Sequence, residues 1–160
     1  MPKLDFTMLH QLLREWCWAA TSVSIDKFFD NNSTWTERKM AEAELGISCS
    51  SAAKDCNRVH PLDPPLARVK RLRGNVMTGP LSFNAIKTEI DQQRPICVRV
   101  QWKDGGGHFA AIVGYDIAAT GLQRVFIADA FYGDSSHSYD LFVSKYQGEG
   151  VWTHTYLVQE

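Results

Sequence analysis

Long apolar runs, an excess of charge and a high density of cysteine are all missing from this chain of 160 residues. No stretch reaches the roughly 18 uninterrupted apolar residues that a membrane-spanning helix needs, so the sequence predicts no membrane span. The formal net charge is −1 with histidine counted as neutral. Nucleic-acid binding usually shows as a basic excess or stripe, and we therefore expect no nucleic acid among the partners. Four cysteines are too few for a disulfide scaffold.

The N-terminal segment also lacks the pattern of a secretory signal. Residues 1–10 contain no apolar core that ends in a small-residue cleavage site. We therefore expect a protein that is cytoplasmic as synthesised, and the sequence leaves open its export through another kind of signal.

Three of the four cysteines have ordinary structural explanations. Cys97 lies inside the apolar run 95–100 and is expected to be a small buried hydrophobic residue. Cys49 and Cys56 flank a segment of small residues, where they either close a short disulfide loop or remain two neighbouring thiols. No second Cys/His pair stands at zinc-ligand spacing, so we expect neither a metal site nor a cofactor.

Hydrophobic spacing divides the chain into a helical first half and a strand-rich second half. The expected helices cover residues 16–29, residues 38–45 behind a capping box from Thr34 to Glu37 and before a Gly46 stop, a short piece near 66–72, and a piece from Ser82 to about 92. The expected strands cover 96–102, 108–115, 123–129 and 151–158, with a short helix at 138–146 between the last two. This order predicts one α+β domain, with a helical part at about 1–94 packed on an antiparallel sheet at about 95–160.

Cys17 stands where the first expected helix begins, six residues after Gln11. Free N–H groups and the helix dipole at an N-terminus favour a thiolate over a thiol, and the thiolate is the nucleophilic form. The competing interpretation is a buried and inert cysteine, which is common for this residue type. We favour a nucleophile, because the upstream glutamine and the helix start agree with that role.

His108 is the expected general base and acid. It follows three glycines, which allow close approach of a substrate chain, and it opens an apolar strand. The competing interpretation is a histidine that is bonded to the backbone within a strand. The remaining histidines are weaker candidates, namely His10, His60, His137 and His154.

Asp129 ends the next expected strand and is suited to accept the second imidazole N–H, which would fix the tautomer and the ring orientation. The competing interpretation is a strand-end aspartate bonded to a turn, and Asp134 and Asp140 lie near enough in sequence to take its place. Together, Cys17, His108 and Asp129 have the residue types of a covalent-catalysis triad.

The order Gln11, Trp16-Cys17-Trp-Ala-Ala, Gly-Gly-His108-Phe and Asp129 resembles the papain-like cysteine peptidases, in particular the compact bacterial branch that includes plant-pathogen effector proteases. The similarity runs from about Gln11 to the C-terminus. It implies a papain-like fold, a protein or peptide substrate, and a thiol protease activity that proceeds through an acyl-enzyme. It leaves open export as an effector or toxin. It leaves the target protein and any activating partner unidentified.

The resemblance also implies roles for two further residues. Gln11 would donate a side-chain N–H to the oxyanion, together with the Cys17 backbone N–H. Without the resemblance, Gln11 would pass for a surface glutamine. Phe131 falls where the family places an aromatic side chain that shields the His–Asp hydrogen bond from water. The pair Glu15-Trp16 departs from the Gly-Ser that precedes the nucleophile in the plant and lysosomal enzymes.

Two alternative functions remain open from the sequence. The same triad serves in deamidases, transglutaminases and acyltransferases, which differ in the bond attacked or in the acceptor. A protease fold that only binds peptides is the second alternative. The complete Cys/His/Asp set argues against a pure binding module, because binding alone needs none of the three.

Overall fold

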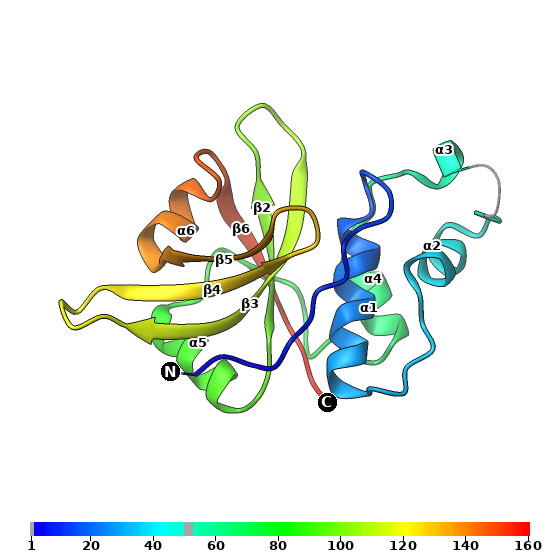
Figure 1. The fold of residues 1–160 in the computed structure, drawn as a ribbon. Helices are drawn as coiled ribbons and strands as arrows, with labels where there is room; N and C mark the ends of the chain where they lie inside the picture. The colour runs from blue at the N-terminus through cyan, green and yellow to red at the C-terminus, as the bar shows by residue number, and fades with distance from the viewer. Residues whose placement is uncertain (1, 50–52) are drawn as a thin grey trace.

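The computed structural model describes residues 2–49 and 53–160, and it shows a sheet with helices gathered around it (Figure 1). The helices are α1 (Cys17–Phe29), α2 (Glu37–Leu45), α3 (Ala53–Cys56), α4 (Asp63–Arg68), α5 (Phe83–Asp91) and α6 (Tyr139–Lys145). The strands are β1 (Met77–Thr78), β2 (Ile96–Gln101), β3 (Gly107–Ile117), β4 (Gln123–Asp129), β5 (Gly133–Ser138) and β6 (Val151–Leu157). None of the helices in the described ranges has the length and apolar character needed to cross a membrane.

The six strands form one sheet in the order β1-β6-β2-β3-β4-β5, and every neighbouring pair is antiparallel. In the central pair, Arg99 of β2 lies opposite Phe109 of β3, and Val100 lies opposite His108. The predicted α+β class with an antiparallel C-terminal sheet is therefore confirmed.

Apolar side chains cover both faces of the sheet, and helices pack on each face. One core joins α1, α2 and α4 to one face, and the strand residues that enter it are Cys97, Phe109 and Tyr156. The other core lies under α5 and α6, and its strand residues include Val98 and Ile112. Residues 96–98 of β2 are all buried, which is the pattern of a strand covered on both faces. The helices thus do not form a single layer, because α5 from the first half shares a face with α6.

Most helix ends follow the predicted capping chemistry. Ser82 caps α5 through a bond from the Ala85 N–H, and Gly46 ends α2 in the left-handed conformation at φ 71°. The predicted cap of α2 was wrong by two residues. Thr36, and not Thr34, accepts the Lys39 N–H, because Glu37 turns inward instead of back over the helix start.

Two other predicted elements differ in place or were missed. The short helix expected near 66–72 begins earlier, at Asp63, because two prolines suit the first turn of a helix. Strand β5 has the sequence Gly-Asp-Ser-Ser-His-Ser, which carries no apolar alternation, and this edge strand was not predicted. Short elements α3 and β1 were missed as well.

The open question about cysteine pairing is answered by the structure. Cys49 and Cys56 form a disulfide, with their Cα atoms 5.8 Å apart. Residues 50–52, which lie inside this loop, are outside the described residues. Cys97 is free and fully buried, and burial raises the pKa of its thiol. Cys97 is therefore the inert cysteine that its apolar context predicted.

Residues 2–16 connect the sheet to α1. Leu4 donates its backbone N–H to Val113 O at 2.8 Å, so the segment starts beside β3. A side chain at Gly114 would lie 2.8 Å from Pro2 O, which explains the glycine at this crossing. Further along, Leu9 donates its backbone N–H to the Ser24 hydroxyl at 2.9 Å. The segment thereby carries Gln11 to the start of α1, as the dark blue trace in Figure 1 shows.

Candidate active site

Cys17 is the first residue of α1, and its side chain is 8% exposed. Trp16 precedes the helix without a side-chain cap hydrogen bond, so no side chain at the cap position satisfies the N–H groups of the first turn. Free N–H groups at this position favour negative charge on the adjacent sulfur. Cys17 is not part of the disulfide and lines a cleft, which leaves it available to react.

The tryptophans on either side of Cys17 anchor a neighbouring loop. Trp16 donates its indole N–H to Cys56 O at 2.7 Å, and Trp18 donates to Arg58 O at 2.9 Å. The Glu15 N–H adds a bond of 2.8 Å to Asn57 Oδ1. These contacts hold residues 56–58 against the start of α1, and the disulfide joins Cys56 to Cys49 in the loop that follows α2. They give a structural reason for tryptophan in place of a small residue before the nucleophile.

His108 and Asp129 face each other across neighbouring strands of the sheet. His108 Nε2 lies 2.9 Å from both Asp129 Oδ1 and Oδ2. Burial by itself would lower the pKa of His108. Hydrogen bonds and charge at Asp129 and Cys17 outweigh burial and raise this pKa to about 9. Because Nε2 is engaged with Asp129, Nδ1 is the ring nitrogen left for Cys17.

The carboxylate of Asp129 is buried and accepts several hydrogen bonds besides that of His108. The backbone N–H groups of Phe131 and Tyr132 donate to Oδ1 at 2.8 and 3.0 Å, and the Tyr146 hydroxyl donates to Oδ2 at 2.7 Å. Burial opposes ionisation, but the His108, Tyr146 and Tyr132 contacts outweigh it and lower the pKa of Asp129. Asp129 is thus held as an anion in a fixed orientation.

Three aromatic rings surround this pair. The Trp102 ring stacks on the His108 ring at 5.7 Å and 25°, and the Tyr132 ring meets His108 edge-on at 6.0 Å. Tyr146 in turn stacks on Trp102 at 6.3 Å. Phe131, predicted as the shielding aromatic, is 51% exposed and contacts the Tyr132 ring instead. The prediction for Phe131 was wrong, because its N–H binds Asp129 while its ring turns to the cleft.

Gln11 is placed at the site by its backbone and is 6% exposed. Its N–H donates to Ala130 O at 3.0 Å, next to Asp129. Its side-chain Nε2 donates to Leu13 O at 3.2 Å and to Arg14 O at 2.6 Å. The surface glutamine that the residue type alone would suggest does not occur here, since the side chain lies at the wall of the same cleft as Cys17.

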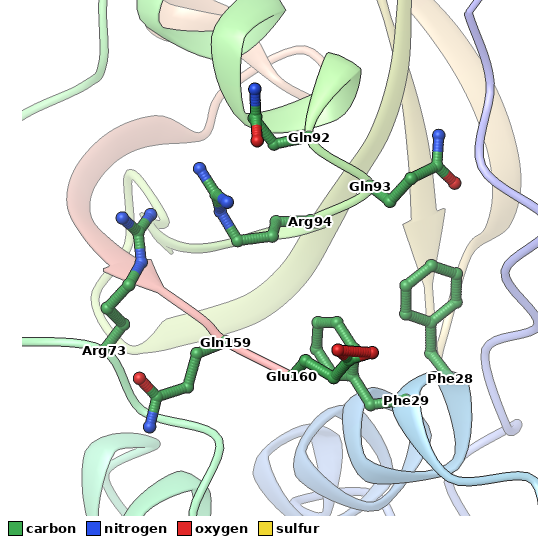
Figure 2. A pocket seen from close by; sticks show the side chains of 8 residues that line it. All are labelled: Phe28, Phe29, Arg73, Gln92, Gln93, Arg94, Gln159 and Glu160. Atoms are coloured by element: carbon green, nitrogen blue, oxygen red, sulfur yellow. The ribbon is translucent and has the colours of Figure 1, made fainter.

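The cleft that joins these residues has a volume of about 370 Å³. Its lining residues are Gln11, Arg14, Glu15, Cys17, Val59, Trp102, Gly105, Gly106, Gly107, His108, Phe131 and Tyr132. A second cavity of about 360 Å³ lies at the other end of α1, beside Phe28 and Phe29 (Figure 2). That cavity is lined by Arg73, Arg94 and glutamines, and no cysteine, serine or histidine lines it among the described residues. The candidate nucleophile Cys17 and the candidate base His108 therefore both line the cleft of about 370 Å³.

The other candidate residues lie away from Cys17 or have other partners. His60 pairs with Glu44 at 2.8 Å, His137 with Ser135, and His154 with Thr153. His10 is exposed, as are Asp134 and Asp140. None of these six side chains lines the cleft in the described part of the chain.

Tyr146, Tyr132 and Trp102 were not singled out from the sequence as site residues. Tyr146 lies just after α6, and its hydroxyl reaches Asp129 across 17 residues of chain. Burial, and then the charge of Asp129, raise the pKa of the Tyr146 phenol, so it stays protonated and acts as a donor. Only the glycine run after Trp102 signalled that this tryptophan borders an open cleft.

The sequence matches the family model described as papain-like cysteine protease AvrRpt2 over residues 2–147. No curated protein matches it. Among solved structures, the crystal structure of the Pseudomonas avirulence protein AvrPphB is similar over 98% of this chain and 98% of that chain, with a TM-score of 0.43 and 9% sequence identity. At this level of similarity we draw no argument from AvrPphB.

Proposed function

This chain belongs to the family of papain-like cysteine protease AvrRpt2, and from that premise we propose that Cys17, His108 and Asp129 form its catalytic triad. The family makes the chain a papain-like cysteine protease and implies a protein substrate. The observation that carries the proposal is the placement of His108 between a carboxylate and a thiol. Nε2 lies 2.9 Å from Asp129, and the Cys17 thiol interacts with the same ring.

In the first half-reaction, the Cys17 thiolate attacks the carbonyl carbon of the scissile peptide bond. The tetrahedral oxyanion that forms collapses, and the carbon–nitrogen bond breaks. The His108 imidazolium gives its Nδ1 proton to the leaving amine. A pKa of about 9 keeps this ring protonated near neutral pH, which suits a proton donor. The products are a thioester on Cys17, an amine and a neutral His108.

In the second half-reaction, the neutral His108 takes a proton from water while the water oxygen attacks the thioester. The carbon–sulfur bond breaks and releases the acid, the Cys17 thiolate and the His108 imidazolium. Asp129 keeps the Nε2–H tautomer in place in both steps and stabilises the cation. The hydroxyl of Tyr146 and the N–H groups of Phe131 and Tyr132 hold Asp129 in turn.

We assign Gln11 to the oxyanion site, together with the Cys17 backbone N–H. The amide of Gln11 has two N–H groups, and its bond to Leu13 O is the longer one at 3.2 Å. As negative charge develops on the substrate oxygen, this N–H would leave Leu13 O and bind the oxyanion. Such a bond is made only in the transition state, and it therefore speeds the reaction. Loss of such a donor typically slows the reaction by about 10²–10³-fold.

A peptide-cleavage assay with site variants tests this proposal. Wild type, Cys17→Ala, His108→Ala and Gln11→Ala are incubated with a proteome-derived peptide library, and the products are identified by mass spectrometry. We expect new peptide termini with wild type, none with the Cys17 and His108 variants, and slow cleavage with the Gln11 variant. A mass shift of about one dalton without new termini would show deamidation instead and would contradict peptide hydrolysis.

Labelling with iodoacetamide provides a second measurement that does not depend on the substrate. The reactive thiol should be Cys17, because Cys97 is buried and the other two cysteines are joined in the disulfide. We expect His108→Ala to slow the labelling near neutral pH, since the imidazolium that stabilises the thiolate is lost. Equal labelling rates for Cys17 and Cys97 would refute the nucleophile assignment.

A further inference from the structure

A further pocket, different from the one beside Phe28 and Phe29, adjoins the catalytic cleft. It has a volume of about 350 Å³ and is lined by Val59, His60, Pro61, Arg99, Gly106, Gly107 and Phe109. Three of these residues, Val59, Gly106 and Gly107, also line the cleft that holds Cys17. The two spaces therefore meet along a common wall. A peptide bound over Cys17 can place one side chain in this adjoining pocket.

The charge in this pocket comes from Arg99 on β2. Its Nη1 donates to Thr153 Oγ1 at 3.0 Å, and its Nη2 donates to Gln101 Oε1 at 2.9 Å. Both acceptors are neutral, and within residues 2–49 and 53–160 no carboxylate oxygen lies within 4.0 Å of this guanidinium. Arg71, Arg73, Arg94 and Arg124, in contrast, each pair with an aspartate or a glutamate. Arg99 is a half-buried cation that lacks a counter-ion.

The backbone fixes where this cation sits. A side chain at Gly107 would lie 2.5 Å from Arg99 Nη2, so the guanidinium packs against the main chain of the residue that precedes His108. With Thr153 and Gln101 as its two anchors, the guanidinium is held in place at the pocket wall. Two N–H groups are used by these anchors, and a guanidinium has five, so donors remain for a ligand.

The other charged groups near the pocket do not neutralise Arg99. His60 lines the pocket, and its Nε2 binds Glu44 at 2.8 Å. Glu44 also accepts from Arg68, so this carboxylate is already engaged by two side chains. The described residues that line the pocket include no aspartate or glutamate. An anionic ligand group would thus meet an unbalanced positive charge.

We propose that this pocket selects an acidic side chain, aspartate or glutamate, in the substrate, and that Arg99 is the specificity-determining residue. This inference rests on the proposed peptidase function and names a feature of its substrate. The guanidinium supplies charge-assisted hydrogen bonds to the carboxylate. The walls formed by Val59, Pro61 and Phe109 contact the methylene groups.

The first experiment is a cleavage-site profile of the wild-type enzyme on the proteome-derived peptide library. We expect Asp and Glu to be enriched at one position within about three residues of the cleaved bond. Synthetic peptides that differ only by Glu→Gln at that position are then compared. We expect kcat/KM to be about tenfold higher for the Glu peptide, as for a hydrogen bond to a charged group.

Two variants identify the residue responsible. Arg99→Gln should abolish the Glu/Gln discrimination while the Gln peptide is still cleaved. Arg58→Gln is the matched control, because Arg58 is exposed, lies one residue before the pocket and does not line it. The control should retain the tenfold preference. A circular dichroism melt of each variant verifies that the fold is intact.

Binding to Cys17→Ala separates this inference from the proposed function. Fluorescence anisotropy with the Glu and Gln peptides reports recognition without chemistry. Tighter binding of the Glu peptide that is lost with Arg99→Gln would support the inference even if wild type cleaved no peptide. Cleavage by wild type without any acidic preference would overturn the inference and leave the peptidase function standing. An acidic preference that survives in Arg99→Gln would also overturn it.

Discussion

Glu37 provides a quantitative test of how burial acts in this fold. It is the first residue of α2, only 4% exposed, and its Oε1 accepts the Leu12 N–H at 2.9 Å. Burial raises the pKa of Glu37 from 4.5 to about 7, although the bond from Leu12 acts in the opposite direction. The substitution Glu37→Gln removes the charge and keeps an oxygen that can accept the Leu12 N–H.

The size of the effect follows from the difference in pKa between folded and unfolded chains. A rise from 4.5 to about 7 corresponds to about 3 kcal/mol, because one pKa unit is worth about 1.4 kcal/mol. The folded state binds the proton more tightly than the unfolded state. The contribution to stability is therefore fully present below pH 4.5 and is lost as the pH rises through about 7. Between pH 5 and pH 8, the loss is about 2–3 kcal/mol.

Urea unfolding of wild type and Glu37→Gln at pH 5 and pH 8 measures this loss. Wild type should lose about 2–3 kcal/mol more than the variant over that interval. His108 titrates in both chains, so its contribution cancels in the comparison. Asp140→Asn is a matched control, since Asp140 lies in the first turn of α6 but is exposed. Its stability difference from wild type should change far less between the two pH values.

A constant gap between wild type and Glu37→Gln from pH 5 to pH 8 would refute this reasoning. A gap that moves in favour of wild type at pH 8 would also refute it, because the bond to Leu12 would then outweigh burial. The expected result has a second consequence for the site. Leu12 follows Gln11, so the titration of Glu37 acts on the segment that holds the proposed oxyanion donor.

Three further predictions concern the residues around Asp129 and the disulfide. Asp129→Asn removes the carboxylate charge that raises the pKa of His108, so the alkaline limb of the kcat/KM–pH profile should move from about pH 9 to lower pH; an unmoved limb would argue against His108 as the proton donor. Tyr146→Phe removes the 2.7 Å bond to Asp129 and should lower kcat about tenfold with little change in KM, whereas the control Tyr139→Phe, which loses a bond to Leu81 O, should leave kcat unchanged. Reduction of Cys49–Cys56 opens an eight-residue loop and should lower the free energy of unfolding by about 2.5 kcal/mol. The double variant Cys49→Ser/Cys56→Ser should match the reduced wild type in urea, and full stability in that variant would contradict the loop-entropy estimate.

Helix ends and apolar strands are where the sequence predicted the fold well. Helix α1 starts at Cys17 and α5 follows the Ser82 cap, because local chemistry determines both positions. The apolar strands at 96–101 and 123–129 lie where periodicity placed them. Strand β5 was missed, since its polar residues pair with β4 only through the backbone and leave no periodic signal.

Some residues of the candidate site could be predicted from the sequence, and others could not. Cys17, His108 and Asp129 stand in recognisable local contexts, and the structure brings His108 to both of the others. Tyr146 could not be foreseen, because its bond to Asp129 depends on how β5 and α6 return the chain to the sheet. Arg99 sits within an apolar strand, and it becomes a candidate only in three dimensions, where no described carboxylate pairs with its guanidinium.

The position of β6 has a consequence for when activity arises during synthesis. This strand is formed by residues 151–157, yet it lies between β1 and β2 inside the sheet. Cys17, His108 and Asp129 all leave the ribosome before it does. Because pairings between distant segments form late, β2 gains its outer neighbour only after residue 157 has emerged. We expect a nascent chain that already carries all three residues to stay inactive until then.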